Sequence, residues 1–85
     1  MYTKTKKLIK FVLRMPKEET SFFYFILESN ENIAFYSTLD FEKGQAYRDI
    51  IVFTTPELLE YLNKILDHLG KKLHIETLNI QEISD

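Results

Sequence analysis

The stretch YRDIIVFTTPELLEYLNKILDHLG, residues 47–70, changes from a two-residue repeat of apolar side chains to a helical repeat. Over residues 47–53, Ile50 and Val52 share one face and alternate with the side chains of the other, as is typical of a strand. Beyond Pro56, apolar side chains recur at the spacing of an amphipathic helix: Leu58, Leu59, Leu62, Ile65, Leu66 and Leu69. The stretch therefore predicts a strand that leads directly into an amphipathic helix.

The junction between these two elements carries the signals of a helix start. Thr54 and Thr55 offer side-chain oxygens for an N-cap, and Glu57 follows Thr54 at the spacing of a capping box. Pro56 suits the first helical position, where a missing N–H costs nothing. Gly70 is typical of the residue just beyond a helix end. We therefore expect the helix to begin at Pro56 and to end before Gly70.

Residues 7–15 predict a strand with two different faces, because apolar side chains occupy every second position. One face is apolar throughout and consists of Ile9, Phe11, Leu13 and Met15. The opposite face consists of Leu8, Lys10, Val12 and Arg14. The apolar face is the one expected to enter a core.

Residues 17–30 predict a helix, and residues 33–39 predict a second strand. Pro16 and the acids that follow it favour a helix start. The apolar stripe of the helix consists of Phe22, Phe23, Ile26 and Leu27. Tyr24 and Phe25 lie off that stripe. The strand is indicated by its β-branched and aromatic residues.

The remaining segments complete a βαββαβ order. Gly44 lies in a polar gap and predicts a hairpin loop over residues 40–45. Residues 74–83 predict a last strand with a bulge or an early end, because their apolar side chains change parity. The order is that of the ferredoxin-like α+β fold, in which four antiparallel strands in the order 4-1-3-2 carry both helices on one face. Residues 1–85 are expected to form this single domain, with residues 1–6 as a flexible basic lead-in.

Composition limits the class of protein. The 85 residues are enough for one core, and the lack of cysteine excludes disulfides, thiolate nucleophiles and sulfur-ligated zinc. The net charge of −2 divides unevenly, since residues 1–17 carry +6 and the rest carries −8. Such asymmetry is found where a chain binds an acidic partner or pairs the charges within its own fold. Neither a signal peptide nor the roughly 20 apolar residues of a membrane span is present, so a cytoplasmic location is expected.

The face of the predicted sheet that carries no helix combines apolar and charged side chains. Apolar side chains that are exposed together are typical of an interface, so this face predicts a homodimer packed sheet to sheet. The candidate interface residues are Val12, Tyr36, Ile51 and Phe53, with Tyr24 and Phe25 as a second patch. The expected function is that of a non-enzymatic binding or regulatory module that acts through protein–protein association.

The basic side chains of the first strand have acidic neighbours in the predicted sheet. Lys10 and Arg14 lie between the third and fourth strands, where they are expected to pair across the sheet with Asp49, Glu76 or Glu82. Such pairs would neutralise much of the basic strand within its own fold.

No residue pattern specifies a catalytic, cofactor or metal site. His68 and His74 lack the spacing of metal ligands and are expected at the surface. The serines lack a nucleophile elbow, and there is no Gly-rich phosphate loop. We therefore expect neither enzymatic activity nor a cofactor, and the alternative is a small enzyme whose site is assembled across a dimer.

A weak single-stranded RNA-binding module is a second alternative. RNA-binding modules of this fold stack bases on aromatic side chains of the two central strands, and residues 43–47 resemble the start of their motif. However, Gln45 replaces the first stacking aromatic, and the acidic composition is unlike that of a nucleic-acid-binding domain. The side chains available to a single strand are Tyr36, Phe53, Lys10 and Arg14.

Four short segments carry a resemblance to a known family. They are Phe25-Ile26-Leu27-Glu28, Ile33-Ala34, Ser37-Thr38-Leu39-Asp40 and Gly44. Over residues 7–70 the chain resembles a small bacterial family named domain of unknown function 4911. That family has no known activity, so the resemblance implies a stand-alone bacterial cytoplasmic domain.

Glu28, in the first of these segments, is unusual for its place. A carboxylate near a helix C-terminus opposes the helix dipole, so packing and capping do not explain it. We expect Glu28 to contact a basic group, such as Lys10 of a neighbouring subunit or a ligand.

Overall fold

Four antiparallel strands and two helices follow one another in the predicted order. The structure is a computed structural model and describes residues 7–30 and 34–84. Its elements are β1 (Lys7–Pro16), the 3-10 turn η1 (Lys17–Glu19), α1 (Thr20–Ser29), β2 (Phe35–Thr38), β3 (Tyr47–Thr54), α2 (Pro56–Gly70) and β4 (Glu76–Ser84). The strand order β2-β3-β1-β4 confirms the ferredoxin-like arrangement. The expected lead-in, residues 1–6, and the expected strand residue Ile33 lie outside the described residues.

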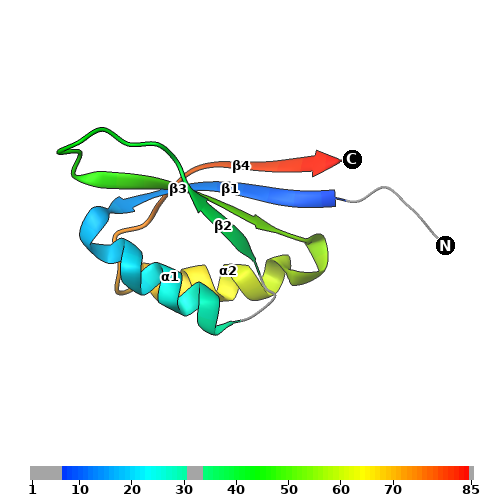
Figure 1. Cartoon of the computed structure of the whole chain (residues 1–85). Coiled ribbons are helices and arrows are strands. Elements are labelled where there is room, and N and C mark those ends of the chain that lie inside the picture. Colours follow the sequence, from blue (N-terminus) through cyan, green and yellow to red (C-terminus); the bar gives the residue numbers. More distant parts are fainter. Residues whose placement is uncertain (1–6, 31–33, 85) are drawn as a thin grey trace.

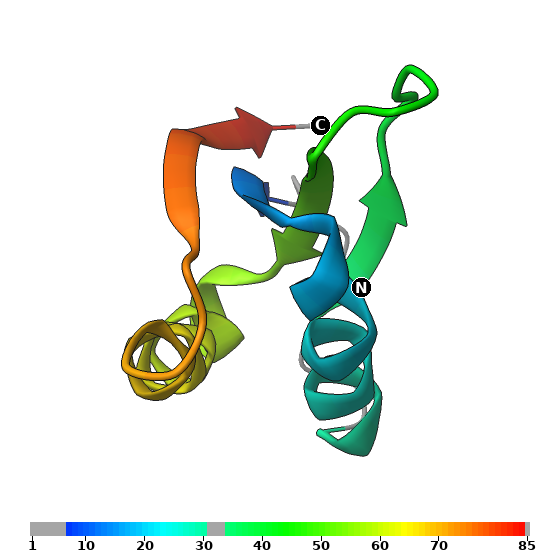
Figure 2. The same ribbon diagram turned by 90° about the vertical axis from the view of Figure 1, so that its left-hand side faces the viewer.

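Both helices lie on the same side of the sheet (Figure 1). The end-on view in Figure 2 shows α1 and α2 below the strands, with no helix above them. Because successive side chains of a strand point to opposite sides, the sheet has a helix-side face and an open face.

The core fills the space between the helix-side face and the helices. β1 contributes the four inner side chains that its alternation predicts, and β3, α1 and α2 contribute two each. The buried apolar residues are Ile9, Phe11, Leu13, Met15, Phe23, Leu27, Ile50, Val52, Leu62 and Leu69. Each such side chain contributes about 1.5–3 kcal/mol of burial free energy, so this layer holds the helices against the sheet.

The first helix differs from its prediction. The 3-10 turn Lys17–Glu19 precedes α1, and the buried side chains of α1 are Phe23 and Leu27. Phe22, expected in the core, is 42% exposed, whereas Tyr24, expected off the apolar stripe, packs against the core. The buried face of α1 is therefore rotated relative to the apolar stripe that the sequence predicts.

The second helix begins at Pro56 as predicted, but its caps differ in detail. Thr55 occupies the N-cap position with extended backbone and makes no side-chain capping bond. Instead, its carbonyl oxygen accepts a hydrogen bond from the backbone N–H of Leu58 at 3.0 Å. Gly70 is the last helical residue and not the residue beyond the helix, and Lys71 is the C-cap.

The two edge strands meet their neighbours as the sequence predicts. Gly44 in the β2–β3 loop has a φ of +87°, a conformation that favours glycine. The β1–β4 register shifts between Val12 and Leu13, because Asn79 and Thr77 are their partners and Leu78 is the extra residue. The expected bulge of the last strand is thus confirmed.

Candidate interaction surface

The open face is built from side chains of all four strands. Cross-strand partners share a face, so the register assigns them to it in rows. It consists of Phe35 and Ser37 of β2, Asp49, Ile51 and Phe53 of β3, Leu8, Lys10, Val12 and Arg14 of β1, and Glu76, Asn79, Gln81 and Ile83 of β4. Neither helix covers these residues (Figure 1).

The centre of the open face is apolar. Val12 lies opposite Ile51, and both are half-buried although no helix packs on them. Phe53 is likewise half-buried and lies opposite Phe35, which is 76% exposed. The sequence thus places Val12, Ile51 and Phe53 correctly on one surface.

Tyr36 does not belong to this surface, and its expected position is wrong. It lies opposite Val52, whose side chain is buried on the helix side, so Tyr36 also faces the helices. Its ring stacks on Tyr24 of α1, with centroids 4.5 Å apart and planes 10° apart. Phe35 occupies the open face in its place, and sequence analysis did not single it out.

The expected second patch divides between two environments. Tyr24 is half-buried under its stack with Tyr36, whereas Phe25 is 61% exposed. The partner of Phe25 at the surface is Phe22, three residues earlier on the same side of α1 and 42% exposed. The exposed patch of α1 is therefore Phe22 and Phe25.

Arg14 and Asp49 form an ion pair across the open face, which confirms one of the predicted pairings. Arg14 Nε donates to Asp49 Oδ1 at 2.8 Å, and Arg14 Nη2 donates to Asp49 Oδ2 at 3.0 Å. The hydrogen bonds hold the pKa of Asp49 below its usual value and raise that of Arg14. The guanidinium carbon also lies 4.1 Å from the ring centroid of Tyr47.

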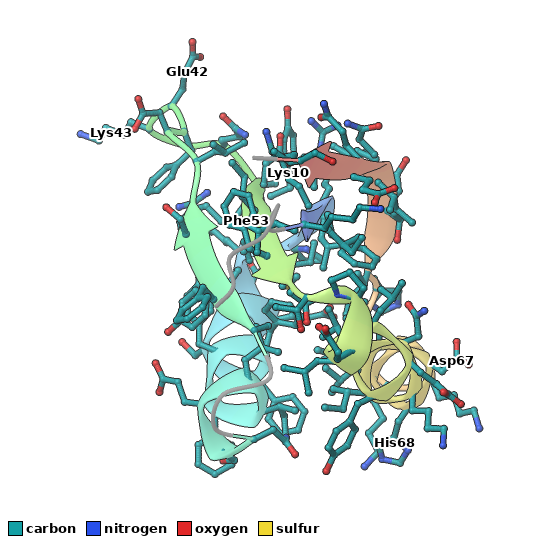
Figure 3. The ribbon with its side chains drawn as sticks, turned by 90° about the vertical axis from the view of Figure 1, so that its right-hand side faces the viewer. Lys10, Glu42, Lys43, Phe53, Asp67 and His68 are labelled. Carbon is teal, nitrogen blue, oxygen red and sulfur yellow. The ribbon has the colours of Figure 1, made fainter. Side chains whose placement is uncertain are left out.

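Lys10 lies on the open face, two residues along β1 from the apolar centre at Val12. It lies between Phe53 on β3 and Gln81 on β4. Figure 3 shows Lys10 and Phe53 on the side of the sheet away from α2. The predicted pairing of Lys10 with an acid across the sheet does not follow from this register, since neither direct neighbour is acidic. Glu82, one of the acids expected to pair with Lys10 or Arg14, instead pairs with Lys7, whose Nζ lies 3.4 Å from Glu82 Oε2.

Glu28 makes a specific contact, but its partner is not the basic group that was expected. The hydroxyl of Tyr36 in the same chain donates a hydrogen bond to the carboxylate of Glu28. This bond and the partial burial of the phenol raise the pKa of Tyr36 to about 12. Glu28 therefore ties α1 to β2 within one chain.

A hollow of about 420 Å³ lies at the end of the sheet where β1 leads into η1. We call it the end hollow, and the residues around it include Arg14, Pro16, Glu18, Tyr47, His74 and Glu76. Its rim overlaps the open face at Arg14 and Glu76. Sequence analysis missed this site because its residues come from three segments that only the fold brings together.

His74 is fixed at the edge of the end hollow by Glu19. The backbone N–H of His74 donates to Glu19 Oε1 at 2.7 Å, and the ring Nδ1 lies 2.8 Å from Glu19 Oε2. These bonds lower the pKa of Glu19. The side chain of His74 is 83% exposed, as expected for a surface histidine. His68 on α2 is also exposed and points away from the sheet (Figure 3).

Two further observations concern cofactors and membranes. Within residues 7–30 and 34–84, no three histidine, aspartate or glutamate side chains come together as a possible metal site. In the same part of the chain, neither helix has the length and apolar character needed to cross a bilayer.

One solved structure with a similar fold is that of CPII from Thiomonas intermedia K12, bound to ADP, AMP and acetate. The two structures have a TM-score of 0.68, and the alignment covers 98% of this chain and 92% of that chain. With 15% sequence identity, the likeness supports the ferredoxin-like fold alone. No curated protein matches the sequence.

The sequence also matches a family model, over residues 13–73. This match covers both helices, β2, β3 and the end of β1, and it does not reach β4. It agrees with the resemblance carried by the segments around Glu28 and Gly44. The chain belongs to the family described as Domain of unknown function (DUF4911).

Proposed function

We propose that the chain is a non-enzymatic binding or regulatory module that forms a homodimer through its open sheet face. The observation that carries this proposal is the apolar centre of the open face. Val12, Ile51 and Phe53 are adjacent in the sheet, Phe35 beside them is 76% exposed, and no helix covers them. Exposed apolar side chains that are grouped in this way are typical of association surfaces.

The size of the open face fits a second copy of the chain. Four strands about 4.8 Å apart, with an average length of about 25 Å, give a face of roughly 500 Å² in projection, and side chains increase the accessible area. A standard interface buries about 800 Å² on each partner, so a sheet-to-sheet dimer would use nearly the whole open face.

A two-fold axis brings the apolar centres of two open faces together. An axis that lies between the two sheets and crosses the strands at Val12 superimposes each end of β1 on the opposite end in the partner. The row of Ile51, Val12 and Asn79 then faces its own copy, so that Val12 and Ile51 of one subunit pack against those of the other. Both copies gain this contact, because the arrangement is symmetric.

Binding of single-stranded RNA is the second candidate, and one row of the open face favours it. Phe35, Phe53 and Lys10 lie side by side in neighbouring strands, which combines two stacking surfaces with a cation. The net charge of −2 opposes it, since nucleic-acid affinity comes mainly from basic side chains. We therefore rank it below self-association.

The first test replaces Ile51 by Lys. A charge in the centre of the interface would be desolvated without a partner, so the variant is expected to be a monomer. The wild type is expected at twice the 10.2 kDa of one chain. Size-exclusion chromatography with light scattering, at equal protein concentrations, measures both masses.

Phe25→Lys is the matched control, because it makes the same change of charge at an exposed apolar residue of α1. It is expected to remain a dimer. A monomeric wild type contradicts the proposal, and so does a dimeric Ile51→Lys variant. If only Phe25→Lys disrupts the dimer, the interface lies on α1 and not on the open face. RNA affinity that falls as salt rises, and that is lost in Phe53→Ala, would favour the second candidate.

A further inference from the structure

The end hollow has the form of a small-ligand site with apolar walls and a few polar groups. Pro16, Ala46 and the ring of Tyr47 line it together with the backbone around Met15, whose side chain is buried. Small-molecule sites in proteins are typically concave and mainly apolar, with charged groups placed to fix one orientation. A volume of about 420 Å³ is enough for a ligand the size of a substituted ring.

Contacts within the chain hold the walls of the end hollow in place. The backbone N–H of Lys17 donates to the carbonyl oxygen of Ala46 at 3.0 Å, which joins the end of β1 to the start of β3. Glu19 accepts two hydrogen bonds from His74, and so fixes the segment before β4. The site therefore exists before a ligand arrives, which lowers the entropic cost of binding.

The basic group at the end hollow is already matched by an acid. The guanidinium of Arg14 gives two hydrogen bonds to Asp49, 2.8 and 3.0 Å long, and lies against the ring of Tyr47. An anionic ligand would have to compete with Asp49 for these donors. Asp49 already binds the guanidinium through two well-formed hydrogen bonds, so an anionic ligand would gain little by replacing it.

Two further carboxylates stand at the end hollow, and one of them, Glu76, lies opposite Arg14 in the sheet and helps to raise the pKa of Arg14 through its charge. In the part of the chain that the structure describes, no hydrogen bond or ion pair within 4.0 Å involves the carboxylate of Glu18 or of Glu76. Both side chains belong to exposed residues, and each glutamate counts as −1 in the formal charge of the chain. Once Asp49 has compensated Arg14, the end hollow therefore carries a net negative charge.

We propose that the end hollow binds a small organic cation, a primary amine or guanidinium carried on a flat apolar body. The apolar body lies against Pro16, Ala46 and Tyr47, and the cationic group lies between the carboxylates of Glu18 and Glu76. Every residue around the end hollow comes from one chain, and two of them, Arg14 and Glu76, also belong to the open face.

Three ligands of the same shape and different charge test this proposal: benzylamine, benzyl alcohol and benzoate. In a ¹⁵N–¹H NMR titration of the full chain, benzylamine is expected to shift the amide signals of Ala46, Tyr47 and Glu76 and to saturate in the millimolar range, as is usual for ligands of about eight heavy atoms. The alcohol and the acid are expected to bind at least about fivefold more weakly, because they lack the charge that Glu18 and Glu76 attract.

The double variant Glu18→Gln/Glu76→Gln is expected to weaken benzylamine binding about five- to tenfold, since two charge contacts at an exposed site are lost. Glu57→Gln/Glu60→Gln is the matched control. It removes the same charge from exposed residues of α2 and is expected to leave the affinity unchanged. Thermal midpoints show whether each variant is folded. If the double variant does not fold, Glu18→Gln and Glu76→Gln are tested singly in its place.

Several outcomes would overturn the proposal. These are equal affinities for benzylamine and benzyl alcohol, tighter binding of benzoate, and benzylamine affinity that is unchanged in Glu18→Gln/Glu76→Gln. The Ile51→Lys variant separates this proposal from the dimer. It is expected to bind benzylamine at least as tightly as the wild type does, because the dimer would cover Glu76 and the monomer leaves it exposed. Loss of binding there would overturn the assignment of the site to a single chain.

Discussion

The phenol of Tyr36 joins β2 to α1 in two ways. Its ring stacks on Tyr24, and its hydroxyl donates a hydrogen bond to Glu28. The hydrogen bond favours the protonated phenol, because a phenolate would repel the carboxylate. A strand of four residues has few backbone bonds of its own, so these side-chain contacts help to decide which face of β2 turns toward the helices.

Replacing Tyr36 by Phe keeps the ring and removes the hydrogen bond to Glu28. The free energy of unfolding is expected to fall by about 0.5–1.5 kcal/mol, the usual net value of one hydrogen bond, and toward the lower end because Glu28 is exposed. Urea unfolding at neutral pH and fixed protein concentration measures it. Tyr61→Phe, at an exposed tyrosine of α2, is the control and is expected to have no effect.

The same comparison has a pH dependence with a defined sign. The pKa of Tyr36 is raised to about 12 in the folded state, against about 10 in the unfolded chain. The stabilisation is therefore fully present below pH 10 and is lost as the pH rises through about 12. The stability difference between wild type and Tyr36→Phe should narrow over that window, and a difference that is constant or widens would contradict this account.

At the scale of elements, α2 depends on a few side chains that enter the core. Leu62 is fully buried there, whereas the adjacent Tyr61 is 53% exposed. Leu62→Ala is expected to lower the free energy of unfolding by about 2–5 kcal/mol, because it removes buried methyl groups and leaves a cavity. Tyr61→Ala is expected to change it by less than about 0.5 kcal/mol. Urea unfolding of both variants tests the assignment, and similar losses would show that the buried face of α2 is wrong.

The sequence predicts strand faces well where one face is apolar throughout. β1 is such a strand, and its inner and outer sets are both correct. β2 is not, because Phe35 and Tyr36 place an aromatic ring on each face and the alternation gives no preference. Its phase is set by pairing with β3 and by contacts to α1, which local pattern does not contain.

The first helix shows a second limit. Its apolar residues are contiguous, so several helical faces are almost equally apolar. In the fold, α1 follows a 3-10 turn and buries Phe23 and Leu27, whereas Phe22 is exposed. The candidate interface was predictable only in part. Val12, Ile51 and Phe53 follow from the alternation of side chains along their strands. The position of Phe35 and the end hollow depend on tertiary structure.

At the scale of the whole molecule, burial is one-sided. The two helices supply a core to one face of the sheet, and the other face keeps half-buried apolar side chains around Val12 with charged ones at Lys10 and Arg14. The charge asymmetry of the sequence is partly balanced within the sheet. Part of the basic first strand is neutralised by acids of its neighbours, as at Arg14 and Asp49, whereas Lys10 lies between Phe53 and Gln81.

A homodimer through the open face makes thermal stability depend on concentration. Unfolding that separates two chains is suppressed by mass action. A tenfold rise in protein concentration therefore raises the free energy of unfolding by about 1.4 kcal/mol per dimer. With about 2.1 cal/mol/K of unfolding entropy per residue, the thermal midpoint of the wild type should rise by about 4 °C for each tenfold increase. Ile51→Lys should show no such rise, because its unfolding involves one chain. Circular-dichroism melts over a hundredfold range of concentration measure this, and a wild-type midpoint independent of concentration would contradict a dimer that persists up to unfolding.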